Sequence, residues 1–131
     1  HVHWLGRLDA TALHQQRTVA WATAVPSLWY ENAPLSVIES QLAGRPVLAA
    51  DHGGLPEMVE NERPGWLLPP GDASAWADGL RRLARSREDL GAMGERARVR
   101  ARVEHDFDDF LDHHERIYGE TIQRARGGVG R

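Results

Sequence analysis

Residues 30–57 read YENAPLSVIESQLAGRPVLAADHGGLPE and contain a helix, a strand and a turn in close succession. Pro34 suits the first position of a helix, because it has no amide hydrogen to leave unpaired and its backbone angle is already helical. Asn32 can cap the neighbouring amides, and Gly44 is the residue type that closes a helix. We therefore predict a helix over residues 34–43.

The apolar residues of this helix, and of the run behind it, predict where the core lies. Leu35, Ile38 and Leu42 are spaced as one stripe of a helix, which we expect to face the core. Residues 46–50 form a short apolar run, typical of a buried strand, and lead into a paired-glycine turn at residues 53–54. A helix followed by a buried strand belongs to a βαβ unit, from which parallel sheets are built.

The same alternation continues outward on both sides of this stretch. Because strands alternate with helices, we predict an α/β fold with a parallel sheet flanked by helices. Only about four strands can be placed, fewer than a complete doubly wound sheet needs, so we expect further strands upstream. One domain is expected over residues 1–126, with a flexible tail at 127–131. The expected strands are 2–6, 18–25, 46–50 and 66–68, and the further helices are 10–17, 56–60, 72–85, 89–105 and 107–123.

The composition is that of a globular protein without a general polyanion-binding surface. Hydrophobic residues make up 41% and charged residues 27% of the 131 residues, an ordinary balance for one domain with its own core. The net charge of −3 argues against a nucleic-acid binder. All 16 basic residues are arginine, so no lysine can act as a base, form a Schiff base or bind a phosphate.

Three features of the sequence bear on its location. No apolar run approaches the ~20 residues of a membrane span. The first residues, HVHW, lack the basic start and apolar segment of a signal peptide. There is no cysteine, which is compatible with a reducing compartment. We therefore expect a cytoplasmic protein without a membrane span.

Two acidic residues flank the predicted start of the helix. Amides at a helix start carry positive potential and bind phosphate groups, and since Pro34 has no amide hydrogen the donors are those of Leu35 and Ser36. Glu39 lies in the second turn, where an ionised carboxylate can accept hydrogen bonds from a ribose diol. Glu31 precedes the helix and can accept hydrogen bonds from a sugar on the far side of a diphosphate. Two glutamates at this spacing are also common on ordinary surfaces, so spacing alone does not decide.

The residues around the two glutamates resemble a known family. Residues 26–39 (PSLWYENAPLSVIE), 43–47 (AGRPV) and 53–57 (GGLPE) match, in order and spacing, the family-four retaining glycosyltransferases, whose GT-B fold has two Rossmann-like domains facing a cleft. The resemblance is clear over residues 2–72, and residues 103–121 look like the closing helix of that family. It implies that this chain is a single, incomplete C-terminal GT-B domain with a Rossmann-like sheet.

The resemblance also implies roles for individual residues. The E-x7-E pair of the family binds the donor, so Glu31 would contact the donor sugar as the candidate catalytic residue, and Glu39 would contact the nucleotide ribose. The family needs no metal and no cofactor besides its nucleotide-sugar donor. The other donor-site residues implied are Asn32, Leu35, Ser36, Gly53 and Gly54, and those beside the nucleobase are Gly6, Arg7 and Leu8.

The sequence also departs from the family pattern. Family members carry an Arg and a Lys on the diphosphate, upstream of the first strand, and an N-terminal domain with the acceptor site; neither region is in this sequence, which contains no Lys. We therefore expect the N-terminal Rossmann domain of the same enzyme as a partner, and the isolated chain to be inactive as a transferase. Trp21 stands where the family has Asp, and Thr23 where it has a bulky apolar residue, so strand 18–25 should be less well packed.

Other polar groups favour ordinary structural roles. Asp51-His52 suggests a catalytic dyad, but a lone Asp-His pair at a strand end is usually part of a loop. The D-x-D at residues 106–108 opens a predicted helix, where acids are favoured as caps, and the scattered histidines do not predict a metal site. The arginine-rich zone at residues 81–102 contains no aromatic residue on which a base could stack, so we expect a solvated helix face rather than a nucleic-acid site.

Alternatives to a donor-binding domain are also open. A non-catalytic interaction module that kept the fold would show no saturable nucleotide binding. A flavodoxin-like regulatory domain is disfavoured, because only Asp51 is an acid at a strand end. The apolar residues of the last helix make one face of it a candidate for self-association. These residues are Phe107, Phe110, Leu111, His114, Ile117, Tyr118 and Ile122.

Overall fold

Three short parallel strands form the centre of the molecule. The computed structural model describes residues 2–59 and 65–127. Thr23 lies opposite Val47 in the first pair of strands, and Val47 lies opposite Gly65 in the second. The predicted α/β fold with a parallel sheet is confirmed. Across the sheet the strands are β1 (Thr23–Val25), β2 (Val47–Ala50) and β3 (Gly65–Leu68), in this order.

Helices occupy most of the remaining described residues. Two of them begin at an aspartate cap, since Asp9 accepts from the Ala12 amide at 2.8 Å and Asp72 from the Ala75 amide at 2.9 Å. The cap at Asp72 was predicted from the sequence, and each predicted helix has a counterpart among the described residues, although Glu60 of the predicted turn 56–60 lies outside them. The described residues form the helices α1 (Ala10–Val19), α2 (Leu35–Leu42), α3 (Leu55–Met58), α4 (Ala73–Arg85), α5 (Leu90–Glu104) and α6 (Phe107–Gly127).

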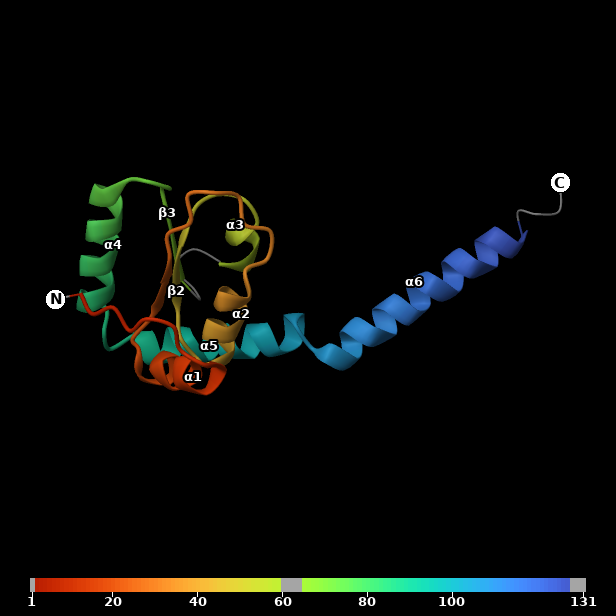
Figure 1. Ribbon diagram of the computed structural model, residues 1–131, viewed down its shortest axis with the longest axis horizontal. Coiled ribbons are helices and arrows are strands. Elements are labelled where there is room, and N and C mark those ends of the chain that lie inside the picture. Colours follow the sequence, from red (N-terminus) through yellow and green to blue (C-terminus); the bar gives the residue numbers. More distant parts are fainter. Residues whose placement is uncertain (1, 60–64, 128–131) are drawn as a thin grey trace.

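The sheet lies between two helical layers (Figure 1). α2 and α3 lie on one side of the sheet and α4 on the other. Val47 of β2 packs in one apolar cluster with Val37 of α2 and Leu55 of α3, whereas the next residue, Leu48, packs in a second cluster with Leu83 of α4. Successive residues of a strand point to opposite faces, so a strand covered on both sides must be apolar throughout. All four residues of β2 are buried, as its continuous apolar run predicted.

α2 buries a different face from the predicted one. Leu35 is 69% and Leu42 is 42% exposed, and Ile38 is only half-buried, so the predicted stripe does not face the core. The helix begins at Leu35, with Pro34 as its N-cap, one residue later than predicted. The residues of α2 that are buried are Val37, Ser40 and Gln41.

Hydrogen bonds explain why α2 can bury polar side chains. The hydroxyl of Ser40 bonds that of Thr23 in β1 at 2.8 Å, and the amide of Gln41 donates to the Met58 carbonyl at 2.8 Å. A buried polar group costs little free energy when its partner is also inside the protein. The stripe prediction was wrong because it counted apolar residues alone.

Two strand predictions were also wrong. Residues 2–6 form no strand, and Trp4 within them is 95% exposed. A strand forms by pairing with a neighbour, and the sheet of the described residues contains β1, β2 and β3 alone. The strand predicted over 18–25 begins only at Thr23, because α1 continues to Val19. β1 lies at the edge of the described sheet, and Val25 is its one buried residue.

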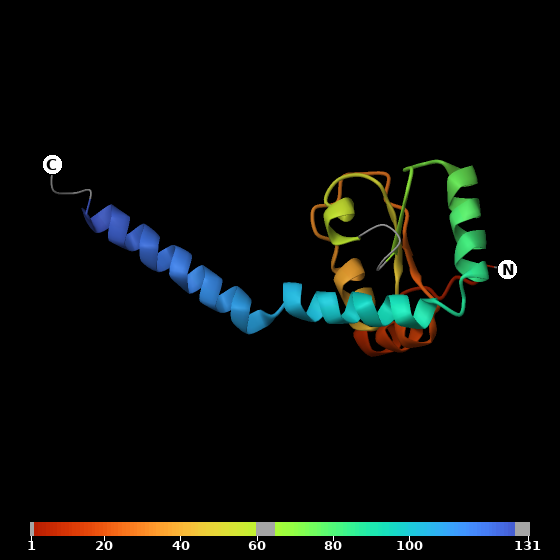
Figure 2. The ribbon, with the colours of Figure 1, turned by 180° about the vertical axis from the view of Figure 1, so that it is seen from behind.

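α6 extends away from the body of the molecule, and both views show it leaving the end of α5 (Figures 1 and 2). Among residues 2–59 and 65–127, no helix is both long and apolar enough to cross a membrane. Gly127 ends α6, and the rest of the tail predicted at 127–131 lies outside the described residues.

Candidate functional site

The carboxyl ends of the strands bring three loops to one edge of the sheet. Because the strands are parallel, residues that follow them meet at the same edge, which is where open α/β sheets bind ligands. Loop 26–34 follows β1, turn 51–54 follows β2, and loop 69–72 follows β3, all at the upper end of Figure 1. The Asp51 amide donates to the Leu68 carbonyl at 2.8 Å, which ties the second strand end to the third.

Glu31 is held at this edge by two contacts. The hydroxyl of Ser27, a buried residue four positions earlier, donates to Glu31 Oε1 at 3.0 Å. The amide of Gly54 donates to the Glu31 carbonyl at 2.8 Å. The first bond orients the carboxylate and the second fixes the backbone, so the half-buried Glu31 has a defined position beside the turn after β2.

The paired glycines allow the two loops to touch. A Cβ atom on Gly54 would lie 1.9 Å from the carbonyl oxygen of Asn32, and one on Gly53 would lie 2.6 Å from the carbonyl oxygen of Glu31. Gly53 also has a φ of +61°, which disfavours other residues. The sequence predicted that these glycines permit close approach of a phosphate. In the structure they permit close approach of the Glu31 loop, so they shape the site through its backbone.

Aromatic rings line the same two loops. The rings of Tyr30 and His52 stack with centroids 5.2 Å apart. Within the described residues, His52 Nε2 is buried without a hydrogen-bond partner. Trp29 and Tyr30 are both largely exposed next to Glu31. The loops therefore offer flat apolar surfaces. Within the described residues, Asp51 and His52 do not form a hydrogen-bonded dyad.

The start of α2 faces outward at this edge. The Val37 amide donates to the Pro34 carbonyl at 3.0 Å, so the amides of Leu35 and Ser36 precede the first hydrogen bond of the helix. Leu35 and Asn32 are exposed, and Ser36 is half-buried. The predicted diphosphate donors thus lie at an accessible helix start, one residue after the loop that carries Glu31.

Glu39 lines a hollow between α1 and α2. Its Oε2 lies 2.6 Å from Nη2 of Arg17, and the Glu39 side chain is 50% exposed against 14% for Arg17. The hollow has a volume of about 320 Å³. It is lined by Ala10, His14, Arg17, Glu39, Leu42 and Ala43. Since a helix rises ~1.5 Å per residue, Glu39 lies about 6 Å along the axis from Leu35, one turn beyond the helix start.

The structure does not bring the residues predicted beside the nucleobase to the Glu31 loop. Gly6, Arg7 and Leu8 precede α1, and the chain before α1 runs along the lower side of the molecule in Figures 1 and 2, away from the loops after β1 and β2. Gly6 has a φ of +66° and precedes a bend at Arg7.

Comparison with known proteins assigns the chain to a family. Residues 1–100 match the model of the family described as glycosyl transferases group 1. This chain belongs to the group 1 glycosyltransferases. The family and the GT-B type of α/β fold expected from the sequence are confirmed.

Two curated relatives of this group 1 chain are glycosyltransferases by name. The amylovoran biosynthesis glycosyltransferase AmsK of Erwinia amylovora is 35% identical over 94 residues, which are 72% of this chain and 22% of that protein. The D-inositol 3-phosphate glycosyltransferase of Saccharomonospora viridis is 38% identical over 107 residues, which are 79% of this chain and 24% of that protein. The chain thus spans about a quarter of the length of these relatives.

Solved structures agree with this assignment. Sucrose-phosphate synthase from Thermosynechococcus elongatus superposes with a TM-score of 0.86 at 28% identity, over 94% of this chain and 31% of that one. Anabaena HepE, solved in complex with UDP, superposes with a TM-score of 0.79 over 87% of this chain and 30% of that one. At 23% identity, HepE shows the shared fold alone.

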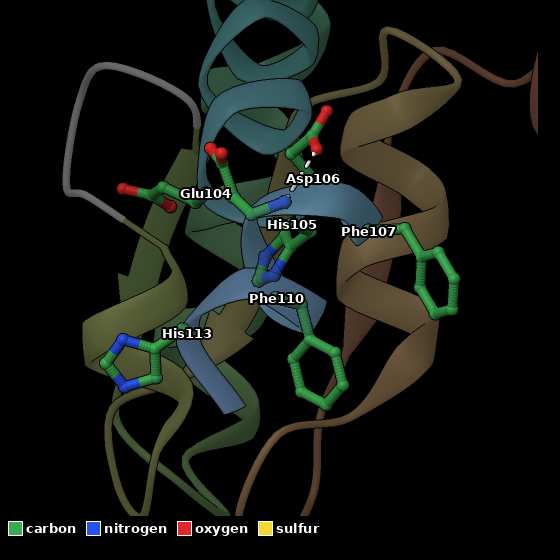
Figure 3. A pocket seen from close by; sticks show the side chains of 7 residues that line it. Glu104, His105, Asp106, Phe107, Phe110 and His113 are labelled. Carbon is green, nitrogen blue, oxygen red and sulfur yellow. Dashed lines mark hydrogen bonds between the residues drawn. The ribbon is translucent and has the colours of Figure 1, made fainter. Parts of the chain in front are cut away.

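A larger hollow of the group 1 chain lies elsewhere, where α5 meets α6 (Figure 3). It has a volume of about 560 Å³ and a mostly apolar wall. The exposed rings of Phe107 and Phe110 lie with centroids 6.3 Å apart. Neither Glu31 nor Glu39 lines this hollow. Its lining residues are Glu104, His105, Asp106, Phe107, Asp109, Phe110 and His113.

The polar groups outside the carboxyl edge have structural roles. Asp106 Oδ1 accepts from the amides of Asp108 and Asp109 at 3.0 and 3.1 Å, which confirms the predicted helix cap. The described part of the chain contains no group of three or more His, Cys, Asp or Glu side chains arranged to hold a metal ion. Hydrogen bonds from Arg98 lower the pKa of Glu95, and the same bonds raise the pKa of Arg98.

Ion pairs within single helices neutralise part of the arginine-rich zone, and the guanidinium carbon of Arg87 lies 4.2 Å from the centroid of the Trp21 ring. Arg81 pairs with Asp78 at 2.6 Å and Arg98 with Glu95 at 2.7 Å, each within one helix. Such exposed pairs along a helix contribute little to stability.

Sequence reasoning missed two residues that hold the glutamates. Ser27 bonds Glu31 and Arg17 bonds Glu39. Ser27 lies only four residues before Glu31, so this side-chain bond could have been predicted from the sequence. The pairing of Arg17 with Glu39 spans two helices and depends on how α1 lies against α2, which no local pattern specifies.

Proposed function

We propose that this chain is the donor-binding part of a retaining glycosyltransferase, which moves a sugar from a nucleotide-diphosphate sugar to an acceptor hydroxyl. The observation that carries the proposal is the loop contact at the carboxyl edge. Glu31 is fixed beside Gly54, in the loop that leads into the start of α2. Membership of the group 1 family supports this use of the edge.

The loops at this edge and the helix α2 that starts there would each hold one part of the donor. The amides of Leu35 and Ser36 would bind the diphosphate, because a helix start favours negative charge and presents free N–H groups. Glu39 would accept hydrogen bonds from the ribose diol, and Glu31 from the donor sugar, with Asn32 and the Gly53-Gly54 turn shaping the sugar pocket. Gly6, Arg7 and Leu8, which precede α1, would lie beside the nucleobase on the α1 side of Glu39, away from the Glu31 loop. Catalysis would come from holding the leaving diphosphate and orienting the sugar.

The rest of the enzyme lies outside this chain in our proposal. An N-terminal Rossmann domain would supply the acceptor site and the second wall of the cleft, and neither a metal nor a cofactor would be needed. The isolated chain would therefore bind donor but transfer no sugar. We place the enzyme in the cytoplasm, where nucleotide sugars are substrates.

Calorimetry with nucleotide sugars tests the binding claim. UDP-glucose is the first ligand to titrate, because solved HepE structures contain UDP or UDP-glucose. We expect saturable binding, and Glu39→Ala should weaken it about tenfold, since hydrogen bonds to a charged acceptor are among the stronger ones. Glu88→Ala is the matched control, because Glu88 is an exposed acid outside the site.

The outcomes separate the parts of the proposal. Equal affinity of the Glu39→Ala variant and the unchanged chain would refute the ribose assignment. Sugar transfer by the isolated chain, assayed with a range of acceptors, would contradict the claim that half the cleft is missing. Loss of all binding to UDP-, GDP- and ADP-sugars would refute a donor site on this chain.

One observation favours a second function, a non-catalytic interaction module. The apolar face of α6 and the hollow at its base are exposed on a helix that leaves the body. Such a module would bind a protein partner through α6 and show no saturable nucleotide binding. The same titration therefore distinguishes it from the donor-binding function.

A further inference from the structure

The ion pair between α1 and α2 is strongly asymmetric in its exposure. Arg17 comes from the last turn of α1 and is 14% exposed, whereas its partner Glu39 on α2 is 50% exposed. Nη2 of Arg17 lies 2.6 Å from Oε2 of Glu39. The cation is therefore set inside the protein, and the carboxylate stands at the surface of the hollow that both residues line.

The position of Arg17 is fixed from outside the pair. The neighbouring residue, Thr18, accepts a hydrogen bond at its carbonyl from the guanidinium of Arg45, which follows α2. Arg45 thereby ties the end of α1 to the chain between α2 and β2. On the other side, the Ser40–Thr23 bond fixes α2 against β1. Both helices that carry the ion pair are thus anchored independently of it.

This geometry has a specific consequence for the Glu39 carboxylate. A glutamate on an exposed helix face samples several rotamers, and a ligand that bonds to it must first order it. Arg17 engages one carboxylate oxygen, which orders the side chain in advance and leaves the second oxygen for a hydroxyl donor. A preorganised acceptor binds more tightly because the ordering cost is already met in the free protein.

The charge of Arg17 acts in the same direction. A diphosphate at the start of α2 and the carboxylate of Glu39 would be like charges separated by only a few residues of helix. The chain has no lysine, so arginine is the one side chain always cationic that it can place there. Arg17 offsets the Glu39 charge at 2.6 Å and so reduces the repulsion between the carboxylate and a bound diphosphate.

We propose that Arg17 is a positioning residue for ribose recognition: it holds Glu39 ready for the nucleotide ribose without touching the ligand itself. The inference rests on the donor-binding function proposed above and adds to it a residue from α1. The quantity that reports on this role is the ratio of the affinities for the ribose and 2′-deoxyribose nucleotides. A loss of folding stability alone would not change that ratio.

The test compares UDP with 2′-deoxy-UDP by titration of the full chain, with GDP and ADP and their 2′-deoxy forms in parallel. We expect the chain to prefer the ribose form about tenfold, from one hydrogen bond to a charged acceptor. Arg17→Gln should reduce this preference to about twofold or less, as should Glu39→Gln, with no further loss in the double variant because the two residues act as one unit. Arg17→Lys, which keeps the charge without the planar fork, should retain an intermediate preference.

Arg85→Gln is the matched control, since it removes an exposed arginine of α4 away from the hollow and should keep the full preference. If the unchanged chain binds UDP and Arg17→Gln keeps or increases the ribose preference, the role of Arg17 is refuted but the donor-binding function is not. An increased preference would mean that Arg17 competes with ribose for Glu39. Absence of nucleotide binding by the unchanged chain would overturn the donor-binding function and this inference together. Thermal melts of each variant show whether it is folded before titration.

Discussion

Glu31 owes its position to the backbone of its neighbours as much as to its own side chain. The Gly54 amide bonds its carbonyl at 2.8 Å, and the carbonyl of the next residue, Asn32, lies where a Cβ of Gly54 would be. A side chain at position 54 and the observed place of the Glu31 loop therefore exclude each other. The carboxylate that we assign to the donor sugar depends on a residue with no side chain.

Gly54→Ala should move this loop. The added Cβ would meet the Asn32 carbonyl oxygen at 1.9 Å, so one of the two loops has to shift. Gly54 has a φ of −83°, which alanine adopts freely, so the effect arises from the contact and not from backbone strain. We expect a loss of about 1–3 kcal/mol in the free energy of unfolding, the usual cost of overpacking, measured by urea denaturation, together with weaker binding of UDP-glucose.

Gly91→Ala provides the control for this substitution. A Cβ on Gly91 meets nothing within 4 Å, and the residue lies in the first turns of α5. Alanine there should stabilise the chain by about 0.5–1 kcal/mol, because glycine loses more backbone freedom on folding. If both variants were equally stable and bound ligand equally well, the loop contact would not hold Glu31 in place.

At the level of helices and strands, the sequence predicted the order of the elements and individual helix caps correctly. It predicted the buried face of α2 and the length of β1 wrongly. Asp72, Gly44 and the apolar run of β2 act through local chemistry, so the helix cap, helix stop and buried strand were read correctly. The buried face of α2 was not, because it depends on bonds from Ser40 and Gln41 to distant parts of the chain. Which polar residue finds a partner inside the core is a property of the assembled fold.

The pairing of strands set a second limit on prediction. Residues 2–6 have the composition of a strand, but β-propensity describes how a side chain fits against neighbours on a sheet. The described sheet gives these residues no neighbour. The same limit applies to the candidate site. Its residues around α2 could be named from the local sequence, but the Arg17–Glu39 pair could not, because it depends on how α1 packs against α2.

Asp72→Ala should destabilise α4 through its first turn. Asp72 accepts from the Ala75 amide at 2.9 Å, and without it that amide loses its partner at the helix start. The expected loss in the free energy of unfolding is about 0.5–2 kcal/mol, measured by urea denaturation. α4 contributes Leu83 to the cluster with Leu48 of β2, so the loss should be seen in global unfolding.

The control for the cap is Asp78→Ala in the same helix. It removes the same charge and breaks the exposed pair with Arg81, which is worth about 0.2–0.5 kcal/mol. If the two variants lost the same stability, the hydrogen bond at the helix start would not be the cause.

At the scale of the whole described chain, three loops meet at one edge of the sheet, and α6 extends away from the body. The loops after β1, β2 and β3 are joined to one another by backbone hydrogen bonds and close contacts, whereas α6 carries its apolar side chains away from the body. Acids occupy the first turn of α6 at Asp108 and Asp109, and arginines its last turn at Arg124 and Arg126. Two copies of α6 packed antiparallel would therefore bring opposite charges together at both ends while burying their apolar faces.

This arrangement predicts that the chain forms a dimer through α6. Ile122 belongs to the exposed apolar face, and Gln123, one position later, points about 100° away from it around the helix. Ile122→Glu should shift the chain toward monomer in sedimentation velocity, because it places a charge in the apolar contact. Gln123→Glu, which introduces the same side chain outside that face, should leave the dimer intact. Added salt should also weaken the dimer, since the paired charges are exposed and screened. A monomer at all concentrations, or equal association of both variants, would show that the α6 face does not bind a second copy of this chain.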